Sequence, residues 1–185
     1  MRWLDALLGR TRPVQPDLDA LFALPSAAVT LEAATGLTPT GLGSVCFRAA
    51  EGAAFSALER DAKELVGAGV TESADSYGYT WLTITRSPGD LGDLVTELHG
   101  VNTTLEGAGF GPSLLCSLVC FADPAGGGLA LVYLYKQGTF YPFAPRGGQR
   151  RDNALELQVR GALNGELRIE EDLARWFPLW GAPGL

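Results

Sequence analysis

The sequence has little histidine, little cysteine and no long apolar run. Its 185 residues include one histidine and three cysteines, an odd number that cannot pair completely into disulfides. No apolar run reaches the roughly 20 residues that a membrane-spanning helix needs. The N-terminus, "MRWLDALLGRTRP", lacks the long apolar stretch and small-residue cleavage site of a secretory signal. We therefore predict a cytoplasmic protein whose thiols are reduced and buried.

Two of the cysteines lie in the apolar stretch "LLCSLVCF", at Cys116 and Cys120. If this stretch is a strand, four residues separate the two side chains by about 13 Å. That spacing is well beyond the reach of a disulfide. We predict that both are unpaired core residues on one face of one strand.

The scarcity of histidine argues against several catalytic sites. A zinc site needs three or four ligands, and the cysteines are spread over different segments with no CxxC or HxxxH spacing. A Ser-His-Asp or Cys-His site would have to use His99, which lies in the middle of a predicted helix. There is also no G-x-S-x-G turn. We predict that the chain is not an enzyme, holds no cofactor, and carries His99 at the surface or boundary of its helix.

Other catalytic patterns also have structural explanations. The stretch "GAGFG" at 107–111 follows a helical pattern and precedes a strand pattern, the reverse of the order in a dinucleotide-binding turn. We predict a helix end and a turn there. The acids Asp90 and Asp93, and the acids at 170–172, stand where helices are expected to begin, and the helix dipole favours negative charge at that end.

Positive charge is in deficit. Fourteen Lys and Arg residues face 21 Asp and Glu, giving a net charge of −7. This balance argues against sequence-independent nucleic-acid binding, which needs a basic face. The hydrophobic share of 46% and the 24 glycines are typical of a globular chain with many turns, and the length suits one domain, residues 1–185.

Apolar periodicity predicts several helices. Residues 53–69 and 87–109 show the clearest patterns, the second with Ser87 as its cap and Pro88 in its first turn. Asp152 is expected to cap a further helix, although the alternation in "LELQVR" also permits a strand. The shorter candidates are 17–24, which Pro25 should interrupt, 26–36, which could be helix or strand, and "EEDLARWF" at 170–177.

The predicted strands are 42–48, 77–86, 114–121 and 129–136. The last two are apolar on both faces, which indicates central strands covered on each side. Their connection, "ADPAGGG", suits an antiparallel hairpin with a wide turn. The pattern as a whole predicts the α+β class, with a mostly antiparallel sheet flanked by helices.

Residues 1–12 form a short amphipathic segment. Trp3, Leu4, Leu7 and Leu8 would share one face of a helix, with arginines beside them. Such a segment could pack on its own domain, dock on a partner, or touch an anionic membrane surface peripherally. It is too short to be a stable helix on its own.

The stretch "YKQGTFYPFAPRGGQRRDNALELQVR" at 135–160 carries the strongest binding signal. Its aromatic side chains would form an edge of the sheet, and an apolar edge needs a cover. We predict that the tail rings at 176, 177 and 180 supply it. Arginines in the following basic turn would form an exposed rim for a protein partner, or for the carboxylate or phosphate of a small ligand. The predicted partner-binding residues are Phe140, Tyr141, Phe143, Arg146, Arg150 and Arg151.

Several stretches together resemble the PspA-associated protein PspAB family. They include "TGLGSVCFRA", "DSYGYTWL", "LYKQGTFYPFAP", "RRDNALELQVRGAL" and "RWFPLWGAPGL", and they span nearly the whole chain. The resemblance implies a link to the phage-shock response, in which PspA, a coiled-coil protein, supports a stressed inner membrane. It supplies no catalytic residues. It implies a non-enzymatic cytoplasmic adaptor or regulator in envelope-stress control that acts through protein-protein contacts. The alternative is a small-ligand-binding domain that uses the aromatic and arginine rim described above.

A second likeness concerns the fold. The helix-then-strand unit "LHGVNTTLEGAGFGPSLLCSLVCF" is similar to the type III secretion chaperone-like YbjN domains. That likeness implies an antiparallel sheet with flanking helices, protein binding and a possible homodimer.

Overall fold

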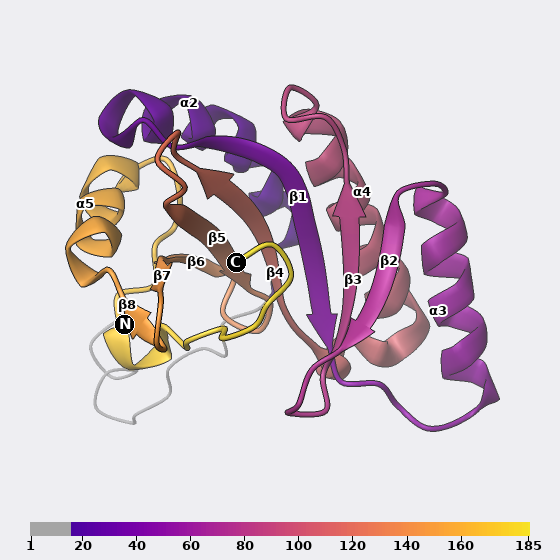
Figure 1. Ribbon diagram of the computed structural model, residues 1–185. Coiled ribbons are helices and arrows are strands. Elements are labelled where there is room, and N and C mark those ends of the chain that lie inside the picture. The colour runs from indigo at the N-terminus through magenta and orange to yellow at the C-terminus, as the bar shows by residue number, and fades with distance from the viewer. Residues whose placement is uncertain (1–15) are drawn as a thin grey trace, which may run out of the picture.

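The computed structural model describes residues 16–185, so the amphipathic segment predicted over 1–12, with Trp3, Leu4, Leu7 and Leu8, lies outside the described residues. A six-stranded antiparallel sheet forms the centre, in the order β2-β3-β1-β4-β5-β6 (Figure 1). Its strands are β1 (Thr38–Phe47), β2 (Val70–Ala74), β3 (Thr80–Thr85), β4 (Leu114–Ala122), β5 (Gly128–Leu134) and β6 (Thr139–Phe143). A small hairpin follows, made of β7 (Pro145–Arg146) and β8 (Arg150–Arg151).

The helices contribute to one core on one face of the sheet. They are η1 (Leu18–Ala23), α2 (Leu24–Thr35), α3 (Ala53–Val66), α4 (Leu91–Leu105) and α5 (Asn153–Leu163), with short turns η2 (Glu106–Phe110), η3 (Gly111–Ser113) and η4 (Leu173–Arg175). Their buried side chains meet those of alternate strand residues such as Val45, Leu82 and Val119 in the larger core cluster. The predicted single-domain α+β class is confirmed.

The first secondary structure of the described chain is helical, from Leu18 to Thr35. Residues 26–36 are helix and not strand, and Gly36, with φ of 77°, ends α2 in the left-handed region. The helix changes type where Pro25 was expected to interrupt it: η1 ends at Ala23, and α2 begins at Leu24 with Pro25 in its first turn. A first-turn proline loses no helical hydrogen bond, since its missing N–H would have had no partner there.

The run Leu18–Thr35 is also apolar and long enough to be considered as a membrane span on composition. In the structure its buried residues belong to the core beneath the sheet. They are Leu18, Leu21, Leu24, Ala27, Ala28 and Leu31. Packing inside the protein therefore accounts for these six side chains, whereas Phe22 and Val29 of the same run stay exposed.

Two predicted helix boundaries need correction. The long helix begins at Leu91, not at Ser87 and Pro88, because residues 87–90 form a turn in which the Asp90 N–H donates to the Ser87 carbonyl at 2.9 Å. Pro-Gly in the middle of "SPGD" favours that turn. The expected helix at 170–177 is reduced to the single turn η4.

Strand β2 was not predicted. Its sequence, "VTESA", is polar and exposed along most of its length, so it lacks the alternation of a half-buried strand. It forms because each of its residues pairs with a residue of β3, from Val70 opposite Ile84 to Ala74 opposite Thr80.

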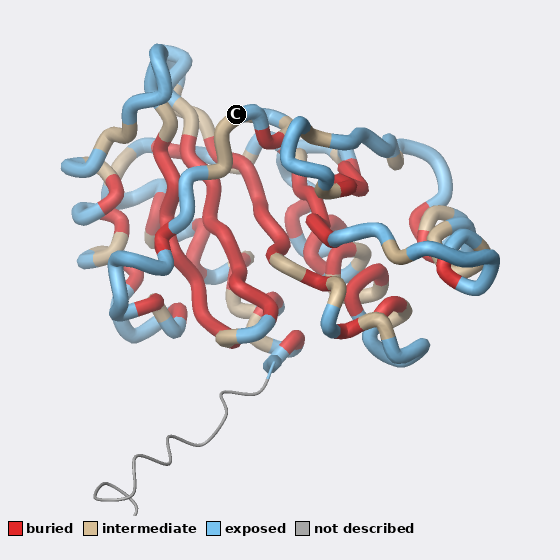
Figure 2. Tube along the Cα trace, turned by 90° about the horizontal axis from the view of Figure 1, so that it is seen from below, coloured by how far each residue is buried: buried red, intermediate tan, exposed pale blue. Residues whose placement is uncertain are grey.

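The other face of the sheet carries no helix from the described part of the chain and is covered by the C-terminal residues 176–185. Buried side chains there come from β1, β3, β4, β5 and β6, together with Trp176 and Ala182 of the tail. Figure 2 shows the central strands as continuous buried segments, with exposed loops at their ends. The tail covers only part of this face, and a pocket lies beside it.

Candidate functional site

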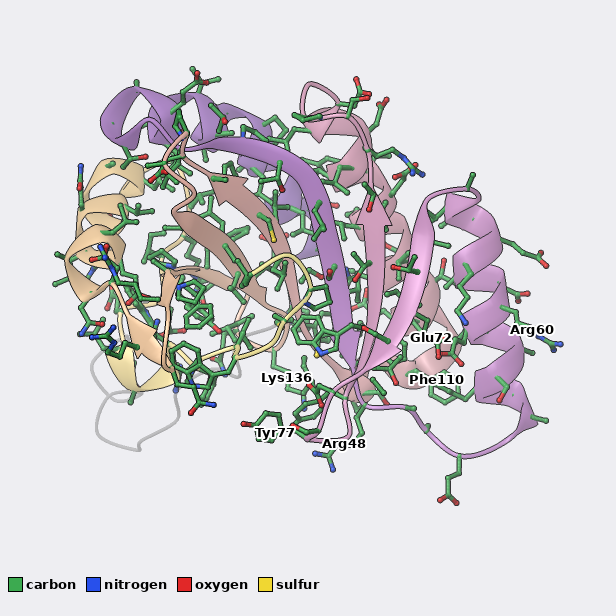
Figure 3. The ribbon with its side chains drawn as sticks, viewed as in Figure 1. Arg48, Arg60, Glu72, Tyr77, Phe110 and Lys136 are labelled. Atoms are coloured by element: carbon green, nitrogen blue, oxygen red, sulfur yellow. The ribbon has the colours of Figure 1, made fainter. Side chains whose placement is uncertain are left out.

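A pocket of about 540 Å³ opens on the sheet face opposite the helices. The β2–β3 turn contributes Tyr77 and Tyr79 to its lining, and the tail contributes residues 177–180. The turn between β5 and β6 adds Lys136, which Figure 3 labels near Tyr77 at the same end of the sheet. The floor is made by side chains from five strands and is mostly apolar: Cys46, Trp81, Leu115, Cys116, Leu134 and Tyr141.

Asp75 shapes the wall between β2 and β3. Its Oδ1 accepts hydrogen bonds from the Tyr77 and Tyr79 N–H groups at 2.8 and 3.0 Å, and its Oδ2 accepts one from Trp81 Nε1 at 3.0 Å. Partial burial would raise the pKa of Asp75, but these donors outweigh it and lower the pKa below its usual value. The charged carboxylate thus positions both the turn and the Trp81 ring on the pocket floor.

Two thiols face each other on the pocket floor. Cys46 of β1 lies opposite Cys116 of β4, and both are free. The hydrogen bond with Cys116 and burial raise the pKa of the Cys46 thiol. Burial raises the pKa of Cys120, further along the same face of β4, to about 12. Protonated, buried thiols are poor nucleophiles, so this floor behaves as an apolar surface. The prediction for Cys116 and Cys120 is confirmed.

The aromatic edge is covered by the tail, largely as predicted. Trp176 stacks on Tyr141 with ring centroids 6.1 Å apart, and Trp180 meets the Phe143 ring edge-on at 5.2 Å. The Tyr141 hydroxyl donates to the Phe177 carbonyl at 2.8 Å. The Phe177 ring is the exception, because 54% of that residue stays exposed. The strand rings are more deeply buried than expected.

Strand β6 is not left as a bare edge. The Phe140 N–H donates to the Arg168 carbonyl at 2.8 Å, and the Glu170 N–H donates to the Phe140 carbonyl at 2.8 Å. The Phe140 ring itself points to the helix side, where it packs on Tyr133 at 5.1 Å. Residues 168–170 therefore occupy part of the edge that a second chain would otherwise use.

The three predicted rim arginines have different surroundings. Arg146 is exposed and pairs with Asp152, and Arg150 is exposed and donates to the Gly147 carbonyl at 3.1 Å. Arg151 is partly buried. It pairs with the buried Glu156 at 2.9 Å and lies 5.0 Å from the centroid of the Phe143 ring.

The six predicted partner-binding residues therefore do not form one surface. The rings of Phe140, Tyr141 and Phe143 are interior, and Tyr141 is the one that lines the pocket. Of the three predicted rim arginines, Arg146 and Arg150 are exposed and Arg151 is not. Partner contact at these two stays a prediction.

Sequence reasoning missed the cations at the pocket mouth. Lys136 is exposed and makes no salt bridge with another residue of 16–185, and Arg175 donates to Gln137 Oε1 at 3.1 Å. Arg175 also lies near two acids: its Nη1 is 3.7 Å from Glu170 Oε1, and its Nε is 3.7 Å from Asp172 Oδ2. Lys136 and Arg175 are distant in sequence, so no local pattern could join them.

His99 lies on the helix side of the molecule. Its Nε2 is 3.0 Å from Asp19 Oδ1, and its ring lies 4.7 Å from that of Phe22. Within residues 16–185, no group of three or more His, Cys, Asp or Glu side chains is placed to hold a metal ion. That His99 is neither catalytic nor a ligand stays a prediction.

The profile of one protein family, described as PspA associated protein B, matches residues 1–184. The chain belongs to this family. The resemblance seen in the sequence is confirmed over essentially its whole length, and the description of the family as PspA-associated is consistent with a link to the PspA system. Searches of the curated proteins and of the solved structures find no match, so the likeness to YbjN domains stays a prediction.

Proposed function

We propose that this PspAB protein is a non-enzymatic cytoplasmic adaptor of the PspA system that binds a protein partner at the pocket mouth. The observation that carries the proposal is a pair of exposed rings that line the pocket, one from the β2–β3 turn and one from the tail. Tyr77 is 65% exposed and Phe177 is 54% exposed. Exposed aromatic rings beside an apolar pocket are typical of the few residues that dominate protein interfaces.

The pocket mouth differs from the other exposed apolar positions. These other positions lie on separate helical elements: Phe22, Val29, Leu65, Leu157 and Leu173. None of them lines the apolar pocket, whereas Tyr77 and Phe177 both do. A partner that buries both rings would contact the turn and the tail at once. Lys136 and Arg175 at the same mouth would favour an acidic partner surface and speed its association.

The proposal is tested with purified PspA from the same organism, titrated into this protein by calorimetry. We expect Tyr77→Ser and Phe177→Ser each to weaken binding by about tenfold or more, since both rings would be central contacts. Phe22→Ser is the matched control, because Phe22 is 48% exposed but lies on the helix side. It should leave the affinity within about twofold.

Two results would contradict the proposal. One is binding of PspA that neither pocket variant changes, which would place the contact elsewhere. The other is no binding of PspA under any condition in which both proteins are folded. Circular dichroism of each variant shows whether the fold is intact.

A further inference from the structure

The pocket is larger and more apolar than an anchor site for one side chain requires. Its volume, about 540 Å³, lies in the range of sites for small organic ligands, roughly 300–1,000 Å³. Its floor is built from thiols and rings, and hydrogen bonds position two of the rings: Trp81 donates to Asp75, and Tyr141 donates to the Phe177 carbonyl. Preformed and apolar walls are typical of a ligand site.

The polar groups of the pocket are unevenly distributed. Lys136, Gln137 and Arg175 lie together at the end formed by the β5–β6 turn and η4. The Asp75 carboxylate lines the pocket too, but three N–H donors already hold its two oxygens. The site therefore has an apolar body and a cationic end.

The cationic end stands out because the chain as a whole is acidic. Its net charge is −7, yet Lys136 has no salt-bridge partner among residues 16–185. Arg175 shares its charge with Glu170 and Asp172, but at 3.7 Å neither pair is tight. Both side chains therefore keep N–H donors for an added anion, and charge-assisted hydrogen bonds to carboxylate or phosphate are among the stronger ones.

We propose that the pocket binds a small amphiphilic anion, a single apolar chain that ends in a carboxylate or a phosphate. The chain would lie over Trp81, Cys46 and Cys116, and the head group would contact Lys136 and Arg175. This is a ligand-binding activity beyond the adaptor role, and it uses a site distinct from the arginines at 146, 150 and 151.

The test compares four probes that share a twelve-carbon chain: dodecanoate, dodecyl phosphate, dodecanol and dodecyltrimethylammonium. The three charged probes are titrated below their micelle concentrations and dodecanol below its solubility limit, with quenching of tryptophan fluorescence and displacement of anilinonaphthalene sulfonate as readouts. We expect saturable one-to-one binding of both anions, and binding of the alcohol and the cation that is weaker by about tenfold or more. Preference for one anion over the other identifies the head group.

Variants separate the charge from the apolar body. Lys136→Glu should weaken both anions by about tenfold or more and leave dodecanol unchanged. Leu115→Trp places a larger side chain from β4 in the pocket and should abolish binding of all four probes. Leu179→Trp, which fills the pocket from the tail, replaces it if the Leu115 variant does not fold. Arg60→Glu is the control, because Arg60 is exposed on α3 and outside the pocket lining (Figure 3).

The inference is overturned by equal binding of anionic, neutral and cationic probes, by anion binding that both pocket-filling variants leave intact, or by no saturable binding. The affinity for PspA is measured on the same variants and is compared independently of probe binding. If no probe binds while Tyr77→Ser and Phe177→Ser still weaken PspA, the pocket is an anchor for a protein partner and the ligand inference fails alone.

Discussion

At the scale of single residues, three acidic side chains organise the irregular parts of this protein. Asp75 holds the β2–β3 turn. Glu156 accepts from the Ala144 N–H and from Arg151 Nε, both at 2.9 Å. Glu170, expected from the sequence to be a helix-dipole partner, is instead buried and accepts from Thr139 Oγ1 at 2.8 Å. Asp75 thus holds a turn, Glu156 joins α5 to β8 and to the residue after β6, and Glu170 joins the chain before η4 to β6.

The first prediction concerns Asp75. Asp75→Ala should lower the free energy of unfolding at about pH 7 by about 1–3 kcal/mol, because three donors lose a charged acceptor. Urea unfolding measures this, and Glu51→Ala at an exposed loop position is the control, with a change within about 0.5 kcal/mol. The tryptophan fluorescence of the variant should also be weaker and shifted to longer wavelength, because Trp81 Nε1 loses its hydrogen bond to Asp75.

The pH dependence of this effect has a definite sign. The folded pKa of Asp75 lies below its unfolded value, so its stabilisation is fully present above the unfolded pKa of about 3.9. It is lost as the pH falls through the folded pKa. The stability difference between the wild type and Asp75→Ala should therefore shrink as the pH falls below the unfolded pKa of about 3.9. A difference that stays constant over this range would contradict the proposed role.

The second prediction separates two neighbouring arginines. Arg151→Met should cost about 3–5 kcal/mol of unfolding free energy, because it leaves the buried Glu156 without its cation. Arg150→Met should change stability by less than about 0.5 kcal/mol, since that side chain is exposed. Thermal or chemical unfolding of the two variants checks this. Equal effects would show that Arg151 is no more structural than Arg150.

At the scale of elements, the C-terminal tail acts as a layer although it is neither helix nor strand. Residues 176–185 cross the sheet face, with Trp176 over Tyr141, Trp180 against Phe143 and Ala182 buried. The approach is close at Gly184, where an added Cβ would lie 2.8 Å from Leu42 Cδ2. Its positive φ of 85° and this contact both favour glycine.

The third prediction contrasts two adjacent rings of the tail. Trp176→Ala should destabilise the protein by about 3–5 kcal/mol, because it empties a buried site and removes the bond from Nε1 to the Glu170 carbonyl. Phe177→Ala should change stability by less than about 0.5 kcal/mol, because its ring is half-exposed. Chemical unfolding measures both.

Deleting residues 178–185 extends the same test to the element. The truncated protein should be less stable and should bind more anilinonaphthalene sulfonate, since the apolar face over β4 and β5 loses its cover. A truncated protein as stable and as monodisperse as the full chain would show that the tail is not the cover.

At the scale of the whole molecule, the sheet separates two cores of unequal thickness. The helix side holds the larger cluster, and the tail side holds a smaller one with the pocket at its end. Strands β1, β4 and β5 have neighbours on both edges and cover on both faces, whereas β2 is an exposed edge strand. Local stability should follow this arrangement.

The fourth prediction is a ranking of hydrogen-exchange protection. Backbone amides of β4 and β5 should exchange slowest, with protection approaching the global free energy of unfolding, and β2 should exchange much faster. Exchange measured by mass spectrometry on peptides from Leu114–Ala122 and Val70–Ala74 checks the order. Protection of β2 equal to that of β4 would mean that another chain covers this edge.

The sequence by itself determined the elements whose signals are local. Helices α3 and α4 follow from apolar spacing, and β4 and β5 from continuous apolar runs. The shared face of Cys116 and Cys120 follows from the two-residue period of a strand. Only the tertiary structure decided the rest.

Strand β2 is polar and needs β3 to form, and Arg150 and Arg151 differ only in what packs beside them. The pocket joins Asp75, Lys136 and Arg175, which are far apart in the chain and meet only because β6 and the tail fold back across the sheet. A site formed by residues far apart in the chain leaves no pattern in any one stretch of sequence. Helix and strand propensities predict single elements, but the packing of those elements against one another decides which residues meet.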